Sequence, residues 1–382
     1  MIPYGKQDIS DSDIQSVVEV LKSDFLTQGP KVPEFESLVA KYCSAEFAVA
    51  VNSATSALHI ACLSLGTQKG DIVWTSPISF VASANCALYC GAKVDFVDID
   101  ISTGNMSVTA LEKKLQIAES KGQLPKIVIP VHLAGQSCDM AKIHALSKQY
   151  GFYIIEDASH AVGGSYQGHK VGSCAYSDIT VFSFHPVKII TSAEGGMALT
   201  NNSNVARKMK KFSSHGVTNI TEELQEVSHG PWYYEQQSLG YNYRMTELQA
   251  ALGISQLERL DKFVKQRNYL AKQYDTLLPE NVLHLSQDVS TESAYHLYIV
   301  KLDEQASNSQ KEIISALREH SIQAHLHYIP IHLQPYYQAL GFNKGDFPNA
   351  EIYYSKAITL PLHPNLTQSE QLFIIDTLRG LL

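Results

Sequence analysis

The sequence predicts an α/β fold in which helices cover both faces of a mostly parallel central sheet, followed by a smaller α+β C-terminal domain. Strand-like and helix-like stretches alternate between residues 47 and 200, which is typical of parallel sheets built from strand–helix–strand units. The strand-like stretches are also apolar throughout, as are strands buried on both faces. A chain of 382 residues is long enough for two domains, and we expect them at residues 1–255 and 256–382.

The individual elements follow from apolar runs and from the residues that stop them. Strands are expected at residues 47–51, 71–75, 93–97, 126–131, 153–157, 178–182 and 197–200. Helices are expected at residues 11–23, 32–43, 52–65, 78–89, 107–120, 139–150 and 205–215, the first of them capped by Asp11 or Ser12.

The second half of the chain begins with residues 216–245, an irregular stretch rich in Tyr and Trp. Thr246 then caps a long helix that extends to about residue 278. We place the domain boundary within this helix, near residue 255. The C-terminal domain is expected to contain a strand at residues 296–302 and helices at residues 310–320, 350–357 and 369–381.

Charge and composition argue against several classes of function. The formal net charge is −8 and the pI about 6.0, so we expect no nucleic-acid partner. The first residues contain no apolar signal core, and no apolar run is long enough to span a bilayer. The six cysteines form no CxxC pair. We therefore expect reduced thiols, no metal site and a cytoplasmic protein without a membrane partner.

The stretch from Ser183 to Met197 contains the lysine on which the chemistry is expected to depend. It follows the strand at residues 178–182, which Pro186 cannot continue because proline donates no hydrogen bond to a neighbouring strand. Lys188 therefore lies on a loop at the end of a central strand, where open α/β sheets bind ligands. Most lysines are solvated surface residues, but a desolvated lysine at this place can form a Schiff base.

Polar groups also follow two other strands. The turn Asn52–Ala57 opens a helix, and the free N–H groups and dipole of that helix favour a phosphate. A plain helix cap would explain one Ser or Thr there, but not four polar residues. Asp157 ends another buried strand, where a lone aspartate is most often a turn residue. Phe80 follows the neighbouring strand and offers an aromatic ring.

Taken together, these groups are the parts that pyridoxal 5'-phosphate (PLP) requires. The helix N-terminus can take the phosphate, and Phe80 can stack on the ring. Asp157 can keep the pyridine nitrogen protonated, since a nearby opposite charge favours the charged form. Lys188 supplies the imine nitrogen. The pattern therefore predicts a PLP enzyme.

Five motifs give the sequence a resemblance to the DegT/DnrJ/EryC1/StrS family of PLP-dependent sugar aminotransferases, which have PLP fold type I. The motifs are Asn52-Ser-Ala-Thr-Ser-Ala57, Glu156-Asp-Ala158, Ser183-Phe-His-Pro-Val-Lys188, Glu194-Gly-Gly196 and Tyr241-Asn-Tyr-Arg-Met245. The resemblance covers nearly the whole chain. Within the family, residues 2–7, 24–30 and 74–78 resemble the members that act in pseudaminic acid biosynthesis.

The resemblance implies a reaction and its partners. The substrate would be a UDP-linked 2-acetamido-2,6-dideoxy-4-keto-hexose, which is converted to its 4-amino sugar with glutamate as the amino donor. An aminotransferase for another nucleotide-linked 3- or 4-keto deoxysugar is the alternative within the family. Epimers of such sugars differ by the placement of one group, and the protein contacts that distinguish them are worth only about 1–3 kcal/mol. The sequence therefore does not identify the exact sugar.

The resemblance also implies a role for each site residue. Lys188 would carry the imine and shuttle a proton, Asp157 would pair with the pyridine nitrogen, and Phe80 would stack on the ring. His160 stands where many relatives have glutamine, next to the cofactor's phenolic oxygen, so its role is open. The phosphate would be held by Ala54, Thr55 and Ser183, with Asn242 reaching in from a partner subunit. Nucleotide-sugar contacts would come from Tyr4, Leu26, Thr27, Lys188, Arg244, His327 and Tyr328.

The aromatic loop at residues 230–245 predicts an oligomer. It is too long and too apolar to be left in solvent. With the family roles of Asn242 and Arg244, it leads us to expect a homodimer whose active sites are shared between subunits. A loop that covers the pocket of its own chain is the alternative.

Three other functions are alternatives to transamination. Dehydratases of the same family replace the imine lysine with histidine, whereas this chain has Lys188. His325, His327 and His332 offer a zinc site, since His-x-His on a strand places both rings on one face, but no acidic ligand stands near them in the sequence. A non-catalytic sensor that binds PLP or sugar is disfavoured because all the catalytic parts are present.

Overall fold

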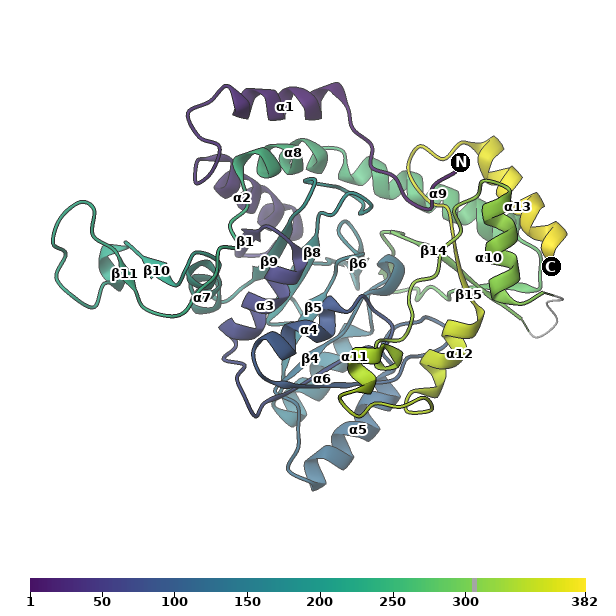
Figure 1. Cartoon of the computed structure of the whole chain (residues 1–382), viewed down its shortest axis with the longest axis horizontal. Coiled ribbons are helices and arrows are strands. Elements are labelled where there is room, and N and C mark those ends of the chain that lie inside the picture. The colour runs from purple at the N-terminus through teal and green to yellow at the C-terminus, as the bar shows by residue number, and fades with distance from the viewer. Residues whose placement is uncertain (304–307) are drawn as a thin grey trace.

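The large sheet of the protein has the predicted class. The computed structural model describes residues 1–303 and 308–382 (Figure 1). In spatial order the strands of this sheet are β1 (Phe47–Val51), β9 (Gly196–Thr200), β8 (Ile179–Ser183), β5 (Tyr153–Asp157), β4 (Ile127–Ile129), β2 (Ile72–Thr75) and β3 (Lys93–Phe96). Neighbouring strands pair in parallel from β8 to β3, whereas β9 runs antiparallel to both β1 and β8. The sheet is therefore mostly parallel.

Helices cover this sheet, and further helices follow in the C-terminal part of the chain. They are α1 (Asp11–Leu21), α2 (Lys31–Cys43), α3 (Ala54–Ser64), α4 (Ala82–Tyr89), α5 (Val108–Ser120), α6 (Met140–Tyr150), α7 (Ser203–Ser213), α8 (Glu247–Leu257), α9 (Leu260–Leu277), α10 (Gln310–Glu319), α11 (Pro335–Gln338), α12 (Pro348–Lys356) and α13 (Gln368–Leu381). No helix formed by the described residues is long and apolar enough to cross a membrane.

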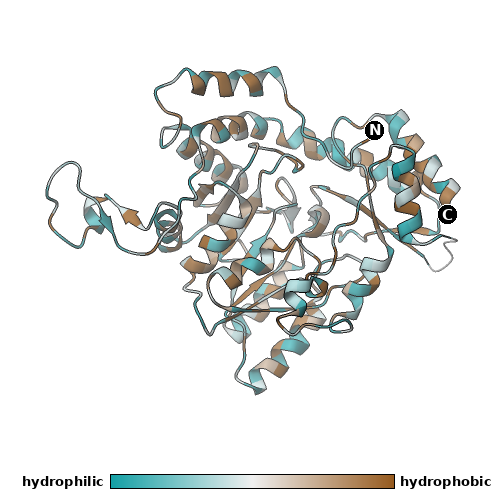
Figure 2. Cartoon of the chain, in the orientation of Figure 1, coloured by the Kyte–Doolittle hydropathy of each residue, from teal (hydrophilic) through white to brown (hydrophobic). Residues whose placement is uncertain are grey.

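Alternate residues of the central strands enter different cores. In β4, Ile127 and Ile129 pack in a core with α3 and α4, whereas Val128 between them packs with α5 and α6. In β9, Ala198 belongs to the first core and Leu199 to one formed with α2 and α8. This alternation explains the apolar strands, because both faces of the sheet are covered. The outer helices α1 and α5 carry both hydrophobic and hydrophilic residues (Figure 2).

The C-terminal part has its own sheet and core. Its strands β12 (Val282–His284), β14 (Tyr298–Leu302) and β15 (Ala357–Leu360) pair antiparallel. Leu270, Leu317 and Ile375, from α9, α10 and α13, pack in one core with strand residues of this sheet. The N-terminal segment joins the same part, since Ile2 pairs with Ile322. We propose that residues 256–382 constitute the smaller domain and residues 1–255 the larger one.

The structure corrects the prediction of one helix from residue 246 to residue 278. Thr246 caps α8 as predicted, but α8 ends at Leu257 and α9 begins at Leu260. Arg259 between them has φ −104° and ψ 2°, outside the helical range. Its guanidinium pairs with the carboxylates of Asp8 and Asp13, so this side chain ties the break to the N-terminal segment and α1.

Several smaller elements also differ from the prediction. Helix α1 is capped by Ser10, not by Asp11 or Ser12, and Ser10 forms a capping box with Asp13. The helix expected from residue 78 begins at Ala82. The strands that were not predicted are β12 and β15 of the C-terminal sheet and the short strands β6 (Ser165–Tyr166), β7 (His169–Lys170), β10 (Val217–Thr218), β11 (Glu235–Gln236) and β13 (Thr291–Glu292). The β10–β11 pair turns the stretch expected to be irregular into a hairpin that extends away from the body of the chain (Figure 1).

Candidate active site

A cavity of about 870 Å³ lies at the carboxyl ends of β1, β5 and β8. A cavity of this size is within the usual range for small-molecule sites. It contains most of the predicted site residues, which are Tyr4, Ala54, Thr55, Phe80, Asp157, His160, Ser183, Lys188, His327 and Tyr328. Residues that are distant in sequence therefore meet where the strand-end argument places a ligand.

Lys188 lies on the loop after β8, and its side chain lines the cavity. Its backbone N–H donates to the carbonyl oxygen of His185 over 2.9 Å, which closes a tight turn that includes Pro186. Burial lowers the pKa of the Lys188 amine to about 8, although the nearby charge of Asp157 acts in the opposite direction. With this pKa, roughly a tenth of the amine is unprotonated at pH 7. An unprotonated lysine is a nucleophile, as imine formation requires.

Asp157 ends β5 and is 4% exposed. One carboxylate oxygen, Oδ2, accepts a hydrogen bond from Ser83 Oγ over 2.5 Å. The other, Oδ1, accepts from the Ser159 N–H over 3.2 Å and from Ser159 Oγ over 2.6 Å. These three bonds fix the carboxylate on the cavity wall. A fixed, buried carboxylate suits a partner that carries a positive charge, as a protonated pyridine does.

The start of α3 forms the opposite part of the cavity. Ser53 is the N-cap, and its Oγ accepts from the Ser56 N–H over 3.1 Å. The Ser56 hydroxyl in turn donates to Asn52 Oδ1 over 2.7 Å. The Thr55 hydroxyl makes no hydrogen bond within the described part of the chain, and the side chain lines the cavity. The first N–H groups of α3 and the Thr55 hydroxyl thus suit a phosphate group.

Gly196 allows this turn to approach the sheet. A Cβ atom at Gly196 would lie 2.4 Å from the Ala54 nitrogen and 2.4 Å from the Ser53 carbonyl carbon, closer than non-bonded atoms can come. Any side chain at this position would therefore push the start of α3 away from β9. The glycine is part of the resemblance motif at residues 194–196, and the structure gives its physical reason.

His160 is buried and neutral. Its Nδ1 accepts from the Ala134 N–H over 3.3 Å, which leaves the proton of the neutral ring on Nε2. Nε2 lies 3.0 Å from the Tyr328 hydroxyl oxygen, so this nitrogen donates to Tyr328. Burial, together with the charge of Lys188, lowers the pKa of His160 well below its ordinary value. His160 is therefore a hydrogen-bond donor that orients Tyr328 at the cavity.

His327 and Tyr4 form a further wall of the cavity. His327 Nδ1 lies 2.9 Å from Thr359 Oγ1, and burial lowers the pKa of His327 to about 3. The ring of Tyr4 lies 5.2 Å from that of His327, measured between centroids. The ring of Phe80 is 61% exposed and lies 6.4 Å from that of Tyr328. An exposed ring on the cavity wall is free to stack on a planar ligand.

Four predicted residues do not line the cavity of their own chain. Leu26 is exposed. Thr27, in the segment that joins α1 to α2, forms a β-bridge with Thr246. Asn242 pairs with Ser214 beside α7. Arg244 Nη1 donates to Ser214 Oγ over 3.2 Å. The backbone of Arg244 nevertheless pairs with Val51, directly before the cavity residue Asn52.

The sequence argument missed other residues that shape the cavity. Ser83 and Ser159 hold the Asp157 carboxylate, and Glu194 and Gln249 line the cavity wall. Gln249 Nε2 donates to the Glu194 carbonyl oxygen over 2.9 Å, which joins α8 to the loop that contains Lys188. Ser159 follows Asp157 by two residues, the spacing of a common Asp–Ser turn, and that spacing was the one available signal.

The three histidines of the zinc alternative have other partners. His327 bonds with Thr359, and His332 Nε2 lies 3.0 Å from Glu351 Oε1. One acidic residue, Glu351 of α12, reaches His332 although it is distant in the sequence. Among residues 1–303 and 308–382, no group of three or more His, Cys, Asp or Glu side chains is arranged to hold a metal ion.

Comparisons with known proteins agree with the geometry of this cavity. Residues 7–379 match the model of the DegT/DnrJ/EryC1/StrS aminotransferase family. The chain is 39% identical to the spore coat polysaccharide biosynthesis protein SpsC of Bacillus subtilis, over 100% of this chain and 97% of that protein. It is 36% identical to a UDP-4-amino-4,6-dideoxy-N-acetyl-β-L-altrosamine transaminase of Campylobacter jejuni, over 100% of this chain and 98% of the transaminase.

Solved structures of sugar aminotransferases have a similar fold. The fold is similar to that of Helicobacter pylori PseC, an aminotransferase involved in the biosynthesis of pseudaminic acid, with a TM-score of 0.91 and 33% identity over 100% of this chain and 98% of PseC. It is also similar to the sugar aminotransferase Spr1654 of Streptococcus pneumoniae in its PLP form, with a TM-score of 0.89 and 30% identity over 100% and 98% of the two chains.

Proposed function

Because the chain belongs to the DegT/DnrJ/EryC1/StrS family of PLP-dependent sugar aminotransferases, we propose that it aminates C4 of a UDP-linked 2-acetamido-2,6-dideoxy-4-keto-hexose with glutamate as the donor. The observation that carries the proposal is the meeting of Lys188, Asp157 and the start of α3 in one cavity of about 870 Å³. The full-length similarity to a transaminase of the pseudaminic acid type supports the choice of sugar.

The residues of the cavity account for the chemistry that this reaction needs. Bound PLP supplies an electron sink for the negative charge that develops beside the transferred nitrogen. The Asp157 carboxylate holds a proton on the pyridine nitrogen by charge pairing. The start of α3, Thr55 and Ser183 bind the phosphate. Lys188 Nζ, with a pKa of about 8, would hold the cofactor when it is bound and would serve as the acid–base group beside it.

The test is an amination assay against a panel of UDP- and dTDP-linked 4-keto and 3-keto deoxysugars, with glutamate and other amino acids as donors. Product stereochemistry is read by NMR. We expect the highest kcat/KM for a UDP-linked 2-acetamido-2,6-dideoxy-4-keto-hexose with glutamate. Preference for a different nucleotide or keto position would replace the proposed substrate, and binding of PLP without turnover on any sugar would favour the sensor.

We predict that the nucleotide is required for efficient turnover. Binding energy from the remote nucleotide positions the keto carbon, so free 4-keto sugar should react with a kcat/KM lower by at least about a hundredfold. The measurement compares initial rates for free and UDP-linked sugar with the same enzyme and donor. Equal kcat/KM values for the two forms would refute the prediction.

We also propose a homodimer with shared active sites. The hairpin that contains β10 and β11 extends away from the chain (Figure 1) and carries exposed apolar side chains, with Trp232 74%, Tyr234 63% and Leu239 76% exposed. Arg244 lies outside its own cavity, as described above. A two-fold interface is self-complementary, so it would cover both hairpins and bring each Arg244 to the other chain.

Subunit mixing tests the shared site. Lys188→Ala and Arg244→Ala chains, each nearly inactive alone, are mixed and allowed to exchange. If Arg244 acts across the interface, a mixed dimer has one site that lacks both groups and one intact site. With random pairing, about half of the dimers are mixed, so roughly a quarter of all sites should recover. No recovery, once mass spectrometry has confirmed exchange, would leave the hairpin as a structure local to its own chain.

A further inference from the structure

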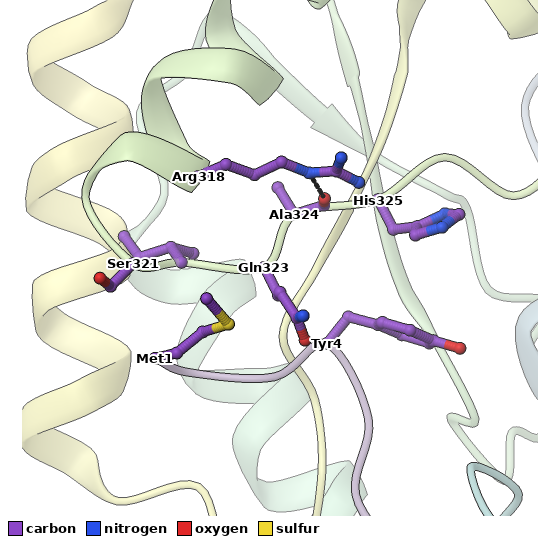
Figure 3. A pocket seen from close by; sticks show the side chains of 8 residues that line it. Met1, Tyr4, Arg318, Ser321, Gln323, Ala324 and His325 are labelled. Atoms are coloured by element: carbon purple, nitrogen blue, oxygen red, sulfur yellow. Dashed lines mark hydrogen bonds between the residues drawn. The ribbon is translucent and has the colours of Figure 1, made fainter.

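A second, smaller cavity of about 250 Å³ adjoins the active-site cavity (Figure 3). It lies between the N-terminal segment and the segment that follows α10, and Arg318, Ser321 and Gln323 contribute to its lining. Tyr4 and His325 line both this cavity and the larger one. Their rings lie 5.3 Å apart, measured between centroids. These two rings therefore mark the border of the two cavities, and an elongated ligand in the larger cavity would have to extend past them to enter the smaller one.

Arg318 contributes a charged side chain to this smaller cavity, and it is exposed. Its Nε donates to the Ala324 carbonyl oxygen over 3.0 Å, which orients the planar guanidinium. Its two Nη groups make no hydrogen bond or ion pair within the described residues. In Figure 3 the guanidinium extends toward the side of the cavity on which the His325 ring lies. An oriented guanidinium whose two Nη amino groups are both free matches the oxygens of a phosphate.

The other lining residues leave this charge uncompensated. Among the described residues, no aspartate or glutamate lines the smaller cavity. Nearby polar groups are the amide of Gln323, the hydroxyl of Ser321 and the imidazole of His325, all of which can donate hydrogen bonds. An uncompensated cation surrounded by donors favours an anionic ligand. The chain as a whole is acidic, with a formal net charge of −8, so this local exception is not a general feature of the surface.

We propose that Arg318 binds the diphosphate of the nucleotide-linked substrate and is a specificity-determining residue for its nucleotide part. This inference rests on the proposed function. The larger cavity must already hold PLP and the keto sugar, so the nucleotide needs space beyond it. The smaller cavity adjoins it at Tyr4 and His325, and it contains the charge that a diphosphate requires. Arg318 would act on substrate binding and not on the chemistry at Lys188.

The experiment uses the PLP-loaded enzyme and UDP as the probe. Dissociation constants are measured by calorimetry for wild type, Arg318→Gln, Arg318→Lys and the control Lys311→Gln, which removes an equal charge from the exposed face of the same helix. We expect Arg318→Gln to weaken UDP binding roughly tenfold, as the loss of a charge-assisted hydrogen bond does. Arg318→Lys should recover part of the affinity, and Lys311→Gln should bind as wild type does.

Kinetics give a second readout and separate the outcomes. In Arg318→Gln the KM for the UDP-linked sugar should rise with kcat nearly unchanged, and an unaltered reaction with glutamate alone would show that the variant is folded. Unchanged UDP affinity in Arg318→Gln would overturn the role of Arg318 while leaving transamination intact. Weaker UDP binding without amination of any UDP-linked sugar by wild type would support the anion site and refute the proposed substrate.

Discussion

Lys188→Ala is expected to abolish turnover while the fold persists. The variant loses the amine that attaches PLP and the base that moves the substrate proton, both of which lie at Nζ. The backbone turn remains, because the Lys188 N–H donates to His185 through the main chain. PLP should still bind non-covalently, since the start of α3, Asp157 and Phe80 are unchanged. Steady-state rates with glutamate and keto sugar measure the effect.

Borohydride trapping makes this prediction specific to Lys188. Reduction of the wild-type enzyme followed by intact mass measurement should show one covalent adduct of PLP per chain. Lys188→Ala should show none, although PLP remains after gel filtration. The matched control is Lys69→Ala, which removes an exposed lysine outside the cavity and should behave as wild type does. Multiple turnovers by purified Lys188→Ala would contradict the assignment.

Asp157→Ala should slow the reaction with glutamate by two or more orders of magnitude. Without the carboxylate the pyridine nitrogen loses its proton, and the electron sink weakens. The substitution also removes the acceptor of the Ser159 hydroxyl and one acceptor of the Ser83 hydroxyl, so PLP should bind less tightly. Single-turnover absorbance measurements at saturating PLP isolate the rate effect from the binding effect.

Glu156→Gln is the control for the loss of a buried carboxylate. Glu156 precedes Asp157 on β5 but points away from the cavity, with His132, Ser177 and Thr180 as partners. Its substitution should lower thermal stability with little effect on the glutamate reaction of the folded enzyme. A rate change below tenfold in Asp157→Ala, which corresponds to about 1.4 kcal/mol of barrier, would show that the pairing is wrong.

Strand-end logic explains why the sequence predicts much of the site. Asp157, Ser183 and the turn at residues 52–57 each follow or end an apolar strand, and parallel strands end at one edge. Pro186 cannot continue a strand, and this predicts that Lys188 lies on the loop after the strand. Strand ends and proline breaks are local features of the chain, so they can be recognised in the sequence without knowledge of the tertiary structure.

Features that depend on distant partners were not predictable in this way. Glu258 and Arg259 are ordinary helix formers, and the break between α8 and α9 coincides with the pairing of Arg259 with Asp8 and Asp13. Ser83 contacts Asp157 across 74 positions of sequence, and no local pattern marks it. The two-residue strands β10 and β11 are too short to produce an alternating pattern.

Some of the substrate-contact and cofactor-contact residues assigned by resemblance line the cavity, and others lie outside it. Tyr4, His327 and Tyr328 meet at the cavity although they lie in different parts of the sequence. Leu26, Thr27, Asn242 and Arg244 lie outside it in a single chain. The sequence contains no signal that distinguishes a contact within one chain from a contact across an interface. The shared-site proposal for Asn242 and Arg244 follows from this difference.

The most direct test of the central claim follows the absorbance of bound PLP through both halves of the reaction. The purified enzyme should show a visible band that disappears when glutamate is added alone. Addition of a UDP-linked 2-acetamido-2,6-dideoxy-4-keto-hexose to the glutamate-treated and desalted enzyme should restore the band and yield one 4-amino sugar per site. A band that glutamate leaves unchanged, or one that no nucleotide-linked keto sugar restores, would contradict the account.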